Sequence, residues 1–281
     1  MSDIIRIQNL QKAYPGFALE GVTFSVPRGA VVGFIGENGA GKTTAIKCIL
    51  GLVRPSGGGV EVFGKDAALL TAEERGRIGA VLGENCLPEN LTAGQLDRVM
   101  RHIFPHWESE TFASFLGRFS LPQGKKVADF SRGMHQKLAL AVALSHGADV
   151  LVLDEPTAGL DPVARDEILE LLYDFMQEER RSVLISSHIV TDLEKLCDYI
   201  AFIHNGKLLF FEEKDALYER YAVVHAPVEA LQGLKDAVVA ARRGEFGASA
   251  LVRRDKLPAG TSAERAGIEE IMLYFIKGER I

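Results

Sequence analysis

Short apolar runs alternate with amphipathic stretches along the first three quarters of the chain. Residues 30–35, 150–153 and 182–185 are compact and mostly apolar, a pattern typical of strands buried on both faces. Residues 43–50 predict a helix that ends at Gly51, and Asp161 followed by Pro162 predicts the start of another. Strands that alternate with helices predict a mostly parallel core sheet covered on both faces.

Three other stretches depart from this rhythm. The first ~30 residues alternate in polarity around a Pro15-Gly16 turn, which predicts an N-terminal antiparallel β subdomain. Residues 85–146 carry helical patterns instead of strand runs, so we expect an inserted helical subdomain there. Two apolar runs flank Asn205-Gly206 and predict a hairpin.

The pattern changes again after Asp215. Residues 223–224 and 250–252 are possible strands, and the spacing of Ile268, Ile271, Met272 and Phe275 fits an amphipathic helix. We therefore expect a domain at 1–215, a linker near 212–217, and a small C-terminal α/β appendage of unassigned role at 216–281. The fold class predicted is α/β with this appendage.

Composition narrows the possible partners. The 281 residues are 47% hydrophobic and 25% charged, with a net charge of -6, so a nucleic-acid partner is disfavoured. The three scattered cysteines lack metal-ligand spacing and fit free thiols in a reducing cytoplasm. We expect neither a secretory signal nor a membrane-spanning segment, so any membrane role needs a partner.

A phosphate-binding pattern follows the first buried run. Residues 36–44 match GxxxxGK[ST] between a predicted strand and a predicted helix, which favours a P-loop over an ordinary glycine-rich turn. Lys42 is expected to reach the β- and γ-phosphates of ATP, and Thr43 to ligate Mg²⁺. The expected ATP-binding residues here are Gly36, Asn38, Gly39, Ala40, Gly41, Lys42, Thr43 and Thr44.

Polar groups also follow two other predicted strands. Asp154 and Glu155 end one, so they should emerge at the carboxyl edge of the sheet, where parallel α/β folds bind ligands. Asp154 is a candidate Mg²⁺ ligand, and Glu155 a candidate base for the attacking water, although both could simply cap the next element. His188 ends another strand and is either a γ-phosphate contact or a structural histidine.

These motifs, in this order, resemble an ABC-type ATPase over about residues 4–215. The distinguishing segment is residues 130–138, which resembles the family's signature and opens a predicted helix. The resemblance implies a P-loop NTPase that forms a homodimer, or a heterodimer with a related subunit, around ATP and Mg²⁺. Ser131, Arg132, Gly133 and Met134 would then meet ATP bound by the opposite subunit, with Gly159, Leu160 and Asp161 at the dimer interface, and catalysis would rest on Glu155, His188 and Lys42.

Four positions bear on how closely the sequence follows the family. Tyr14 stands where the family places an aromatic that stacks on adenine, or is a half-buried strand-end tyrosine. Arg132 and Met134 replace the commoner glycine and glutamine, as in the branch that resembles bacterial exporters with separate permeases. Glu84 stands where the family has a glutamine, and it could ligate Mg²⁺ but donates a hydrogen bond only when protonated.

The resemblance implies an ATPase on the cytoplasmic side of a membrane that powers transport through an integral permease. The branch that it resembles implies export as the direction of transport. Five apolar residues after Glu84 either line a groove for that permease or pack within the helical subdomain: Leu87, Leu91, Met100, Phe104 and Trp107. Two other classes compete, a soluble ABC-type ATPase of translation or DNA repair and a P-loop kinase or GTPase. The first class usually has two ATPase units in one chain or long coiled coils, and neither is visible in this sequence. The second class would not need the Ser131-Arg132-Gly133 segment.

Overall fold

The computed structural model describes residues 2–83, 86–244 and 247–279. Its centre is a six-stranded sheet in the order β10-β9-β3-β8-β7-β6, in which the five strands from β9 to β6 run parallel and β10 is antiparallel to β9. This mixed sheet with a parallel core is the one the sequence predicts. The strands are β3 (Val31–Ile35), β6 (Ile78–Leu82), β7 (Val150–Asp154), β8 (Ser182–Ser187), β9 (Tyr199–His204) and β10 (Lys207–Glu213).

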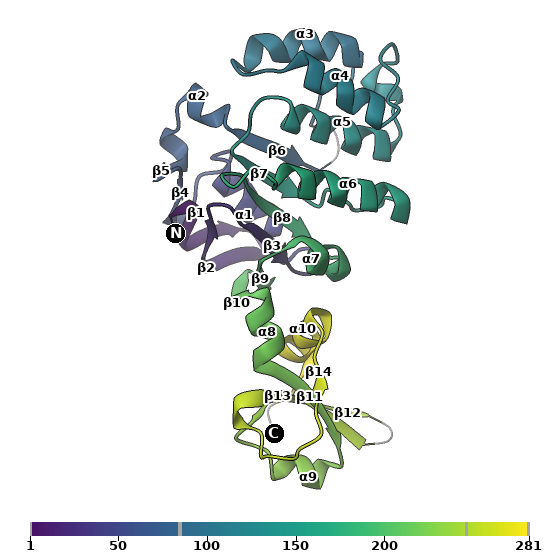
Figure 1. Ribbon diagram of the computed structural model, residues 1–281. Helices are drawn as coiled ribbons and strands as arrows, with labels where there is room; N and C mark the ends of the chain where they lie inside the picture. The colour runs from purple at the N-terminus through teal and green to yellow at the C-terminus, as the bar shows by residue number, and fades with distance from the viewer. Residues whose placement is uncertain (1, 84–85, 245–246, 280–281) are drawn as a thin grey trace.

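Complete burial of the central strands explains their apolar sequences. All residues of β3, β7 and β8 are buried, and helices α1 (Lys42–Ile49), α6 (Pro162–Phe175) and α7 (Val190–Leu196) connect or cover them (Figure 1). In the register of the sheet, Asp154 lies beside Ser186, and Ile35 beside Ser187. The P-loop, the Asp154-Glu155 pair and His188 therefore leave the sheet at one edge.

A second sheet covers the P-loop helix. It is antiparallel in the order β2-β1-β4-β5, as the alternating pattern predicts. Ile46 and Ile49 of α1 are buried in one core cluster with Ile4 of β1 and Val62 of β4. The P-loop helix is thus held between two sheets. The elements here are β1 (Asp3–Tyr14), β2 (Phe17–Pro27), β4 (Gly57–Val62), β5 (Lys65–Asp66), η1 (Ala67–Leu69) and α2 (Ala72–Arg75).

The helical insertion has a core of its own, at the top of Figure 1. Its elements are α3 (Ala93–Ile103), α4 (Ser109–Arg118), η2 (Val127–Asp129) and α5 (Arg132–Leu144). Thr92 and Gln95 form a capping box that starts α3. The apolar residues weighed as a permease groove instead contribute to this core: Met100 is buried, and Leu87, Leu91, Phe104 and Trp107 pack against it.

The C-terminal appendage begins with a helix where the sequence suggested a linker. β10 continues to Glu213 and α8 (Lys214–Arg220) starts at the next residue, so the linker expected near 212–217 is wrong. Lys214 explains this, because its N–H donates to Asp198 O (2.8 Å) and its ammonium to Glu194 O (2.9 Å). The remaining elements are β11 (Tyr221–Ala226), α9 (Val228–Gln232), β12 (Val238–Gly244), β13 (Gly247–Arg253), η3 (Arg254–Lys256), β14 (Glu264–Arg265) and α10 (Ile268–Lys277), with sheet order β12-β13-β11-β14.

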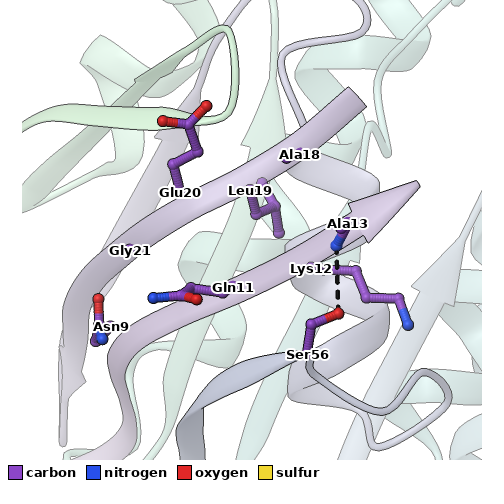
Figure 2. A pocket seen from close by; sticks show the side chains of 9 residues that line it. All are labelled: Asn9, Gln11, Lys12, Ala13, Ala18, Leu19, Glu20, Gly21 and Ser56. Atoms are coloured by element: carbon purple, nitrogen blue, oxygen red, sulfur yellow. Dashed lines mark hydrogen bonds between the residues drawn. The ribbon is translucent and has the colours of Figure 1, made fainter. Parts of the chain in front are cut away.

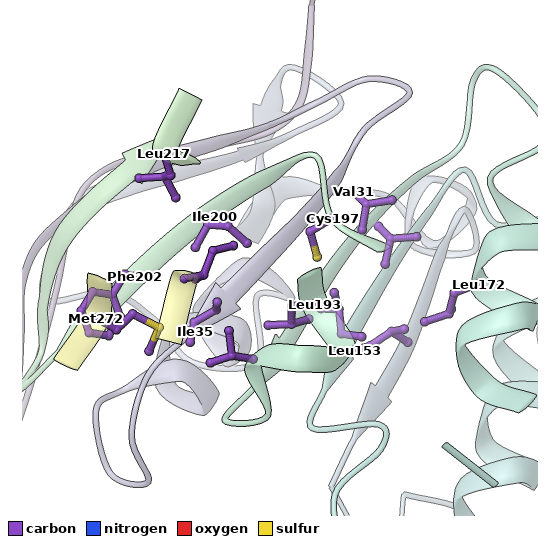
Figure 3. Close-up of a cluster of buried hydrophobic side chains, with 14 of the residues drawn as sticks. Val31, Ile35, Leu153, Leu172, Leu193, Cys197, Ile200, Phe202, Leu217 and Met272 are labelled. Carbon is purple, nitrogen blue, oxygen red and sulfur yellow. The ribbon is translucent and has the colours of Figure 1, made fainter. Parts of the chain in front are cut away.

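Apolar packing joins the appendage to the central sheet. Met272 of α10 and Leu217 of α8 belong to one buried cluster with Phe202 of β9 (Figure 3). The rings of Phe210 and Phe275 extend this contact, with centroids 5.5 Å apart. The two predicted strands and the predicted amphipathic helix are all present, and the helix uses its apolar face for this contact.

A polar contact fixes the same junction. Glu194 of α7 accepts hydrogen bonds from the Tyr218 hydroxyl (3.1 Å) and from Ile268 N (3.2 Å), the first helical residue of α10. Burial, together with the nearby charge of Glu194, raises the pKa of Tyr218 to about 12. One carboxylate thus satisfies two groups of the appendage.

We predict that Glu194→Ala destabilises the protein by about 1–3 kcal/mol, because it leaves the Tyr218 hydroxyl and an α10 N–H without their partner. For a chain of this size that corresponds to a fall in Tm of about 2–4 °C per kcal/mol in thermal unfolding followed by circular dichroism. Glu219→Ala, at an exposed position on α8, is the control. Equal Tm values for the two variants would show that Glu194 does not hold the junction.

Candidate nucleotide-binding and active site

The P-loop connects the carboxyl end of β3 to α1. A Cβ at Gly36 would lie 2.5 Å from the Ile203 carbonyl oxygen, so only glycine fits where the loop leaves the sheet. Gly206 N, in the β9–β10 hairpin, donates to Ala40 O (3.0 Å) and braces the other side of the loop. The loop ends at Gly41, the N-cap of α1, so backbone N–H groups at a helix N-terminus are available to an anion.

Lys42 is buried, and its ammonium lies against the loop's own carbonyl groups. Nζ donates to Gly36 O (2.6 Å) and Glu37 O (3.2 Å), and it pairs with Glu155 Oε1 at 3.1 Å. A buried ammonium needs such partners to remain charged. Phosphate oxygens can replace these partners, because the two carbonyl groups and the carboxylate also contact the ammonium through oxygen atoms.

Asp154 connects the P-loop helix to the neighbouring strands. Thr43 Oγ1 donates to Asp154 Oδ2 (2.7 Å), and Ser186 Oγ donates to Oδ1 (2.6 Å), so both oxygens of this buried carboxylate are engaged. The structure thus brings together the two described residues expected to bind Mg²⁺. Glu84, the third expected ligand, lies outside the described residues.

The donor set suits Mg²⁺. The hydroxyl of Thr43 and the carboxylate of Asp154 are hard oxygen ligands, which Mg²⁺ prefers. The described part of the chain holds no group of three or more His, Cys, Asp or Glu side chains that could bind a metal ion. That is compatible with Mg²⁺, which takes one or two protein ligands and completes its shell with phosphate oxygens and water.

Glu155 adopts an unusual backbone conformation. Its φ is +53°, a left-handed value that costs a non-glycine residue about 1–3 kcal/mol. Ser186 holds it there, since Glu155 N donates to Ser186 Oγ (3.0 Å) and lies 3.2 Å from Ser186 O. The side chain lies between Lys42 and His188, with Oε2 2.6 Å from His188 Nδ1. Glu155 therefore contacts both of the other residues predicted to be catalytic.

The signature segment opens helix α5. Ser131 is its N-cap and accepts a hydrogen bond from Met134 N (3.3 Å), and the first helical residue is Arg132. A Cβ at Gly133 would lie 3.4 Å from Leu160 Cδ2, so the segment adjoins the loop expected at the dimer interface. In that loop Asp161 caps α6, and hydrogen bonds, first from Ala164 N and then from Val163 N, lower the pKa of its carboxyl group.

Tyr14 lies at the end of β1, and its side chain is 43% exposed. Lys12 Nζ lies 5.3 Å from the centre of its ring. A pocket of about 430 Å³ lies beside this part of β1 and β2, and Figure 2 shows Ser56 Oγ bonded to Ala13 N at its side. The residues that line it do not include the P-loop, so this pocket is distinct from the phosphate site.

Ser186 is the functional residue that motif reasoning leaves without a role. It binds the carboxylate of Asp154 and the backbone N–H of Glu155 at once. The only sign of this role in the sequence is a hydroxyl group near the end of an otherwise apolar strand. Its partners, Asp154 and Glu155, lie at the end of the adjacent strand β7, so the sequence around Ser186 does not reveal them.

The fold and this edge of the sheet define a P-loop ATPase. A family model described as ABC transporter matches residues 19–158. The bacitracin transport ATP-binding protein BcrA of Bacillus licheniformis is 37% identical over 74% of this chain and 69% of its own length. The lantibiotic transport ATP-binding protein SrtF of Streptococcus pyogenes is 36% identical over 75% of this chain and 92% of its own.

A comparison with solved structures leads to the same family. A structure described as the ATP binding subunit of an ABC transporter has a TM-score of 0.70 and 30% identity, and covers 76% of this chain and 91% of its own. The chain belongs to the ABC transporter family and is an ATP-binding, ATP-hydrolysing subunit. The fold class and the activity predicted from the sequence are confirmed, and the kinase or GTPase alternative is wrong. Among the described residues, no helix is both long and apolar enough to cross a bilayer.

We predict that Lys42→Ala weakens ATP binding by about 10- to 100-fold or more, because a charge-assisted contact with the phosphates is lost. Titration with a fluorescent ATP analogue measures the affinity. Lys47→Ala, on the exposed face of the same helix, should bind as the unmodified protein does. Full affinity in the Lys42 variant would refute the P-loop assignment.

Proposed function

We propose that two subunits, identical or related, enclose two ATP molecules head to tail, the P-loop of one facing the signature of the other. The observation that carries this proposal is the division of the site between two parts of the fold. The P-loop helix α1 packs on β1, β4 and β7, whereas the signature helix α5 packs on β6, α4 and α6. The exposed N-terminus of α5 at Ser131 offers N–H groups and a positive dipole end to an anion held by another subunit.

In this proposal Glu155 is the general base. Its carboxylate lies within 3.1 Å of Lys42 Nζ and 2.6 Å of His188 Nδ1, so it is placed beside the site of the terminal phosphate. Glu155 would take a proton from the attacking water while His188 and Lys42 hold the γ-phosphate. A positioned base contributes about 10²–10⁴ in rate. Loss of the γ-phosphate removes the bridge between subunits, and the dimer opens.

We propose Mg²⁺ as the cofactor, held by Thr43 and Asp154. When bound, it would supply charge neutralisation for the phosphate oxygens. Ser186 keeps the Asp154 carboxylate oriented toward Thr43, because it donates to the other carboxylate oxygen. For the adenine, we propose stacking on Tyr14, whose ring is partly exposed at the end of β1.

We propose that an integral membrane permease binds a groove on the central domain, which places this subunit on the cytoplasmic side of the membrane. The groove has a volume of about 340 Å³ and is lined mainly by apolar residues, and Leu52 at its rim is 61% exposed. Such an exposed apolar surface suits a protein partner. Its lining residues are Leu50, Leu52, Arg75, Ile78, Ala80, Leu82 and Cys86.

The direction of transport proposed is outward, as the resemblance of the signature to the exporter branch implies. Two relatives are named for transport of bacitracin and of lantibiotics. Within the chain, we propose that residues 1–215, with the helical subdomain at about 85–146, form the ATPase domain. Residues 216–281 form an accessory domain docked on α7. That helix begins two residues after His188, so the accessory domain contacts the helix that directly follows this proposed catalytic residue.

We predict that Glu155→Gln retains ATP affinity, loses turnover by about 10²–10⁴-fold and accumulates as an ATP-bound dimer, because binding survives while proton removal does not. Phosphate release measures turnover, and light scattering after size exclusion measures the dimer. Glu61→Gln on β4, where the side chain is 45% exposed, is the matched control. Unchanged turnover in the Glu155 variant would remove this residue from its proposed role.

A further inference from the structure

The side chain of Arg132 covers Gly159. A Cβ at Gly159 would lie 2.8 Å from the guanidinium carbon of Arg132 and closer still to one of its terminal nitrogens. Gly159 also has φ +72°, a left-handed conformation that disfavours other residues. The backbone conformation therefore favours glycine at this point, and any larger residue would also displace the Arg132 side chain.

The same two segments meet at other points. Gly133 approaches Leu160, and one helical turn beyond Arg132 the ammonium of Lys137 pairs with Glu167 of α6 at 2.6 Å. Helix α5 and the start of α6 are thus joined along their length by an arginine contact, an apolar contact and an ion pair.

The loop under Arg132 continues directly from the general base. Ala158 N donates to Glu155 O (3.2 Å), and Leu160 N donates to Thr157 O (3.3 Å), so the chain from Glu155 to Leu160 is folded into consecutive turns. The side chain of Thr157 is buried at 1% exposure.

We propose that Arg132 is a positioning residue that locks the signature to the interface loop of its own subunit. The inference rests on the proposed head-to-tail dimer, in which Glu155 serves one ATP molecule and the signature of the same subunit serves the other. Through the contact with Gly159, the base of one site and the phosphate contact of the other site move together. The planar guanidinium suits this role because it can lie flat over a residue that has no side chain.

The alternative is that Arg132 acts directly as a cation on the ATP of the opposite subunit. In that case the identity of residue 159 would not alter the effect of replacing Arg132, and Arg132→Lys would keep much of the activity because the charge remains. If Arg132 positions the loop by lying over it, a lysine does not substitute.

The test is a double-mutant cycle of Arg132→Gly and Gly159→Ala in the full-length chain, with kcat, KM and the Hill coefficient for ATP as readouts. Gly159→Ala should lower kcat strongly with Arg132 present, since the new methyl group displaces the guanidinium. The fold decrease in kcat caused by Gly159→Ala should be at least about threefold smaller in the Arg132→Gly background, as expected for residues in contact. Backbone strain is common to both backgrounds and cancels.

Gly260→Ala is the matched control, because Gly260 has φ +85° with nothing within 4 Å of an added Cβ. Its effect should be the same in both Arg132 backgrounds. Arg132→Gly and Arg132→Lys alone should each lower kcat several-fold and reduce the Hill coefficient. ATP affinity of the monomer, measured with a fluorescent analogue, should not change because the P-loop is untouched.

Independent, multiplicative effects of the two substitutions on kcat would overturn the positioning role, as would full activity in Arg132→Lys. These results are distinguishable from failure of the proposed dimer. If Glu155→Gln binds ATP but never dimerises, the head-to-tail arrangement fails and the inference with it. If that variant dimerises while the cycle shows no coupling, only the role of Arg132 is lost.

Discussion

The buried contact between Lys42 and Glu155 is the interaction on which the rest of this site depends. An ammonium and a carboxylate 3.1 Å apart form an ion pair at the base of the P-loop, and the ammonium also donates to two backbone carbonyls. In the proposed mechanism, a phosphate group takes over the ammonium, which frees the carboxylate to act on water. The pair would thus change from a mutual contact into the proposed catalytic machinery.

This contact exists because the parallel sheet delivers three strand ends to one edge. Ser186, at the end of β8, binds both Asp154 and the backbone of Glu155, and so fixes two consecutive acids in different roles. From Glu155 the chain turns twice and reaches Gly159, where it meets Arg132 of the signature. The residues at the sheet edge are therefore linked, through Gly159, to the surface that is proposed to face a second subunit.

Much of this arrangement could be predicted because it is encoded locally. Four features can be recognised from a few consecutive residues each: the P-loop, the Asp154-Glu155 pair, and the N-cap residues Ser131 and Asp161. Contacts between distant segments could not be predicted this way. The bridging role of Ser186 depends on strand register, and the packing of Arg132 on Gly159 depends on how α5 meets the loop before α6.

Two features of the structure differ from what the local sequence indicates. The polar stretch near 212–217 resembles a linker. Lys214, however, donates hydrogen bonds to the carbonyl groups of Asp198 and Glu194, and the stretch forms the end of a strand and the start of a helix. Val163, in the first turn of α6, is apolar, yet it is 70% exposed beside the interface loop. Sequence periodicity marks apolar positions without showing whether they face the protein's own core or another molecule.

The central claim is that neither subunit holds a complete ATP site, and the dependence of specific ATPase rate on protein concentration tests it most directly. The account predicts that the rate per subunit rises with concentration and levels off as dimers saturate, in parallel with the dimer fraction measured by light scattering at saturating ATP. A rate per subunit that stays constant down to concentrations at which every particle is a monomer would contradict it.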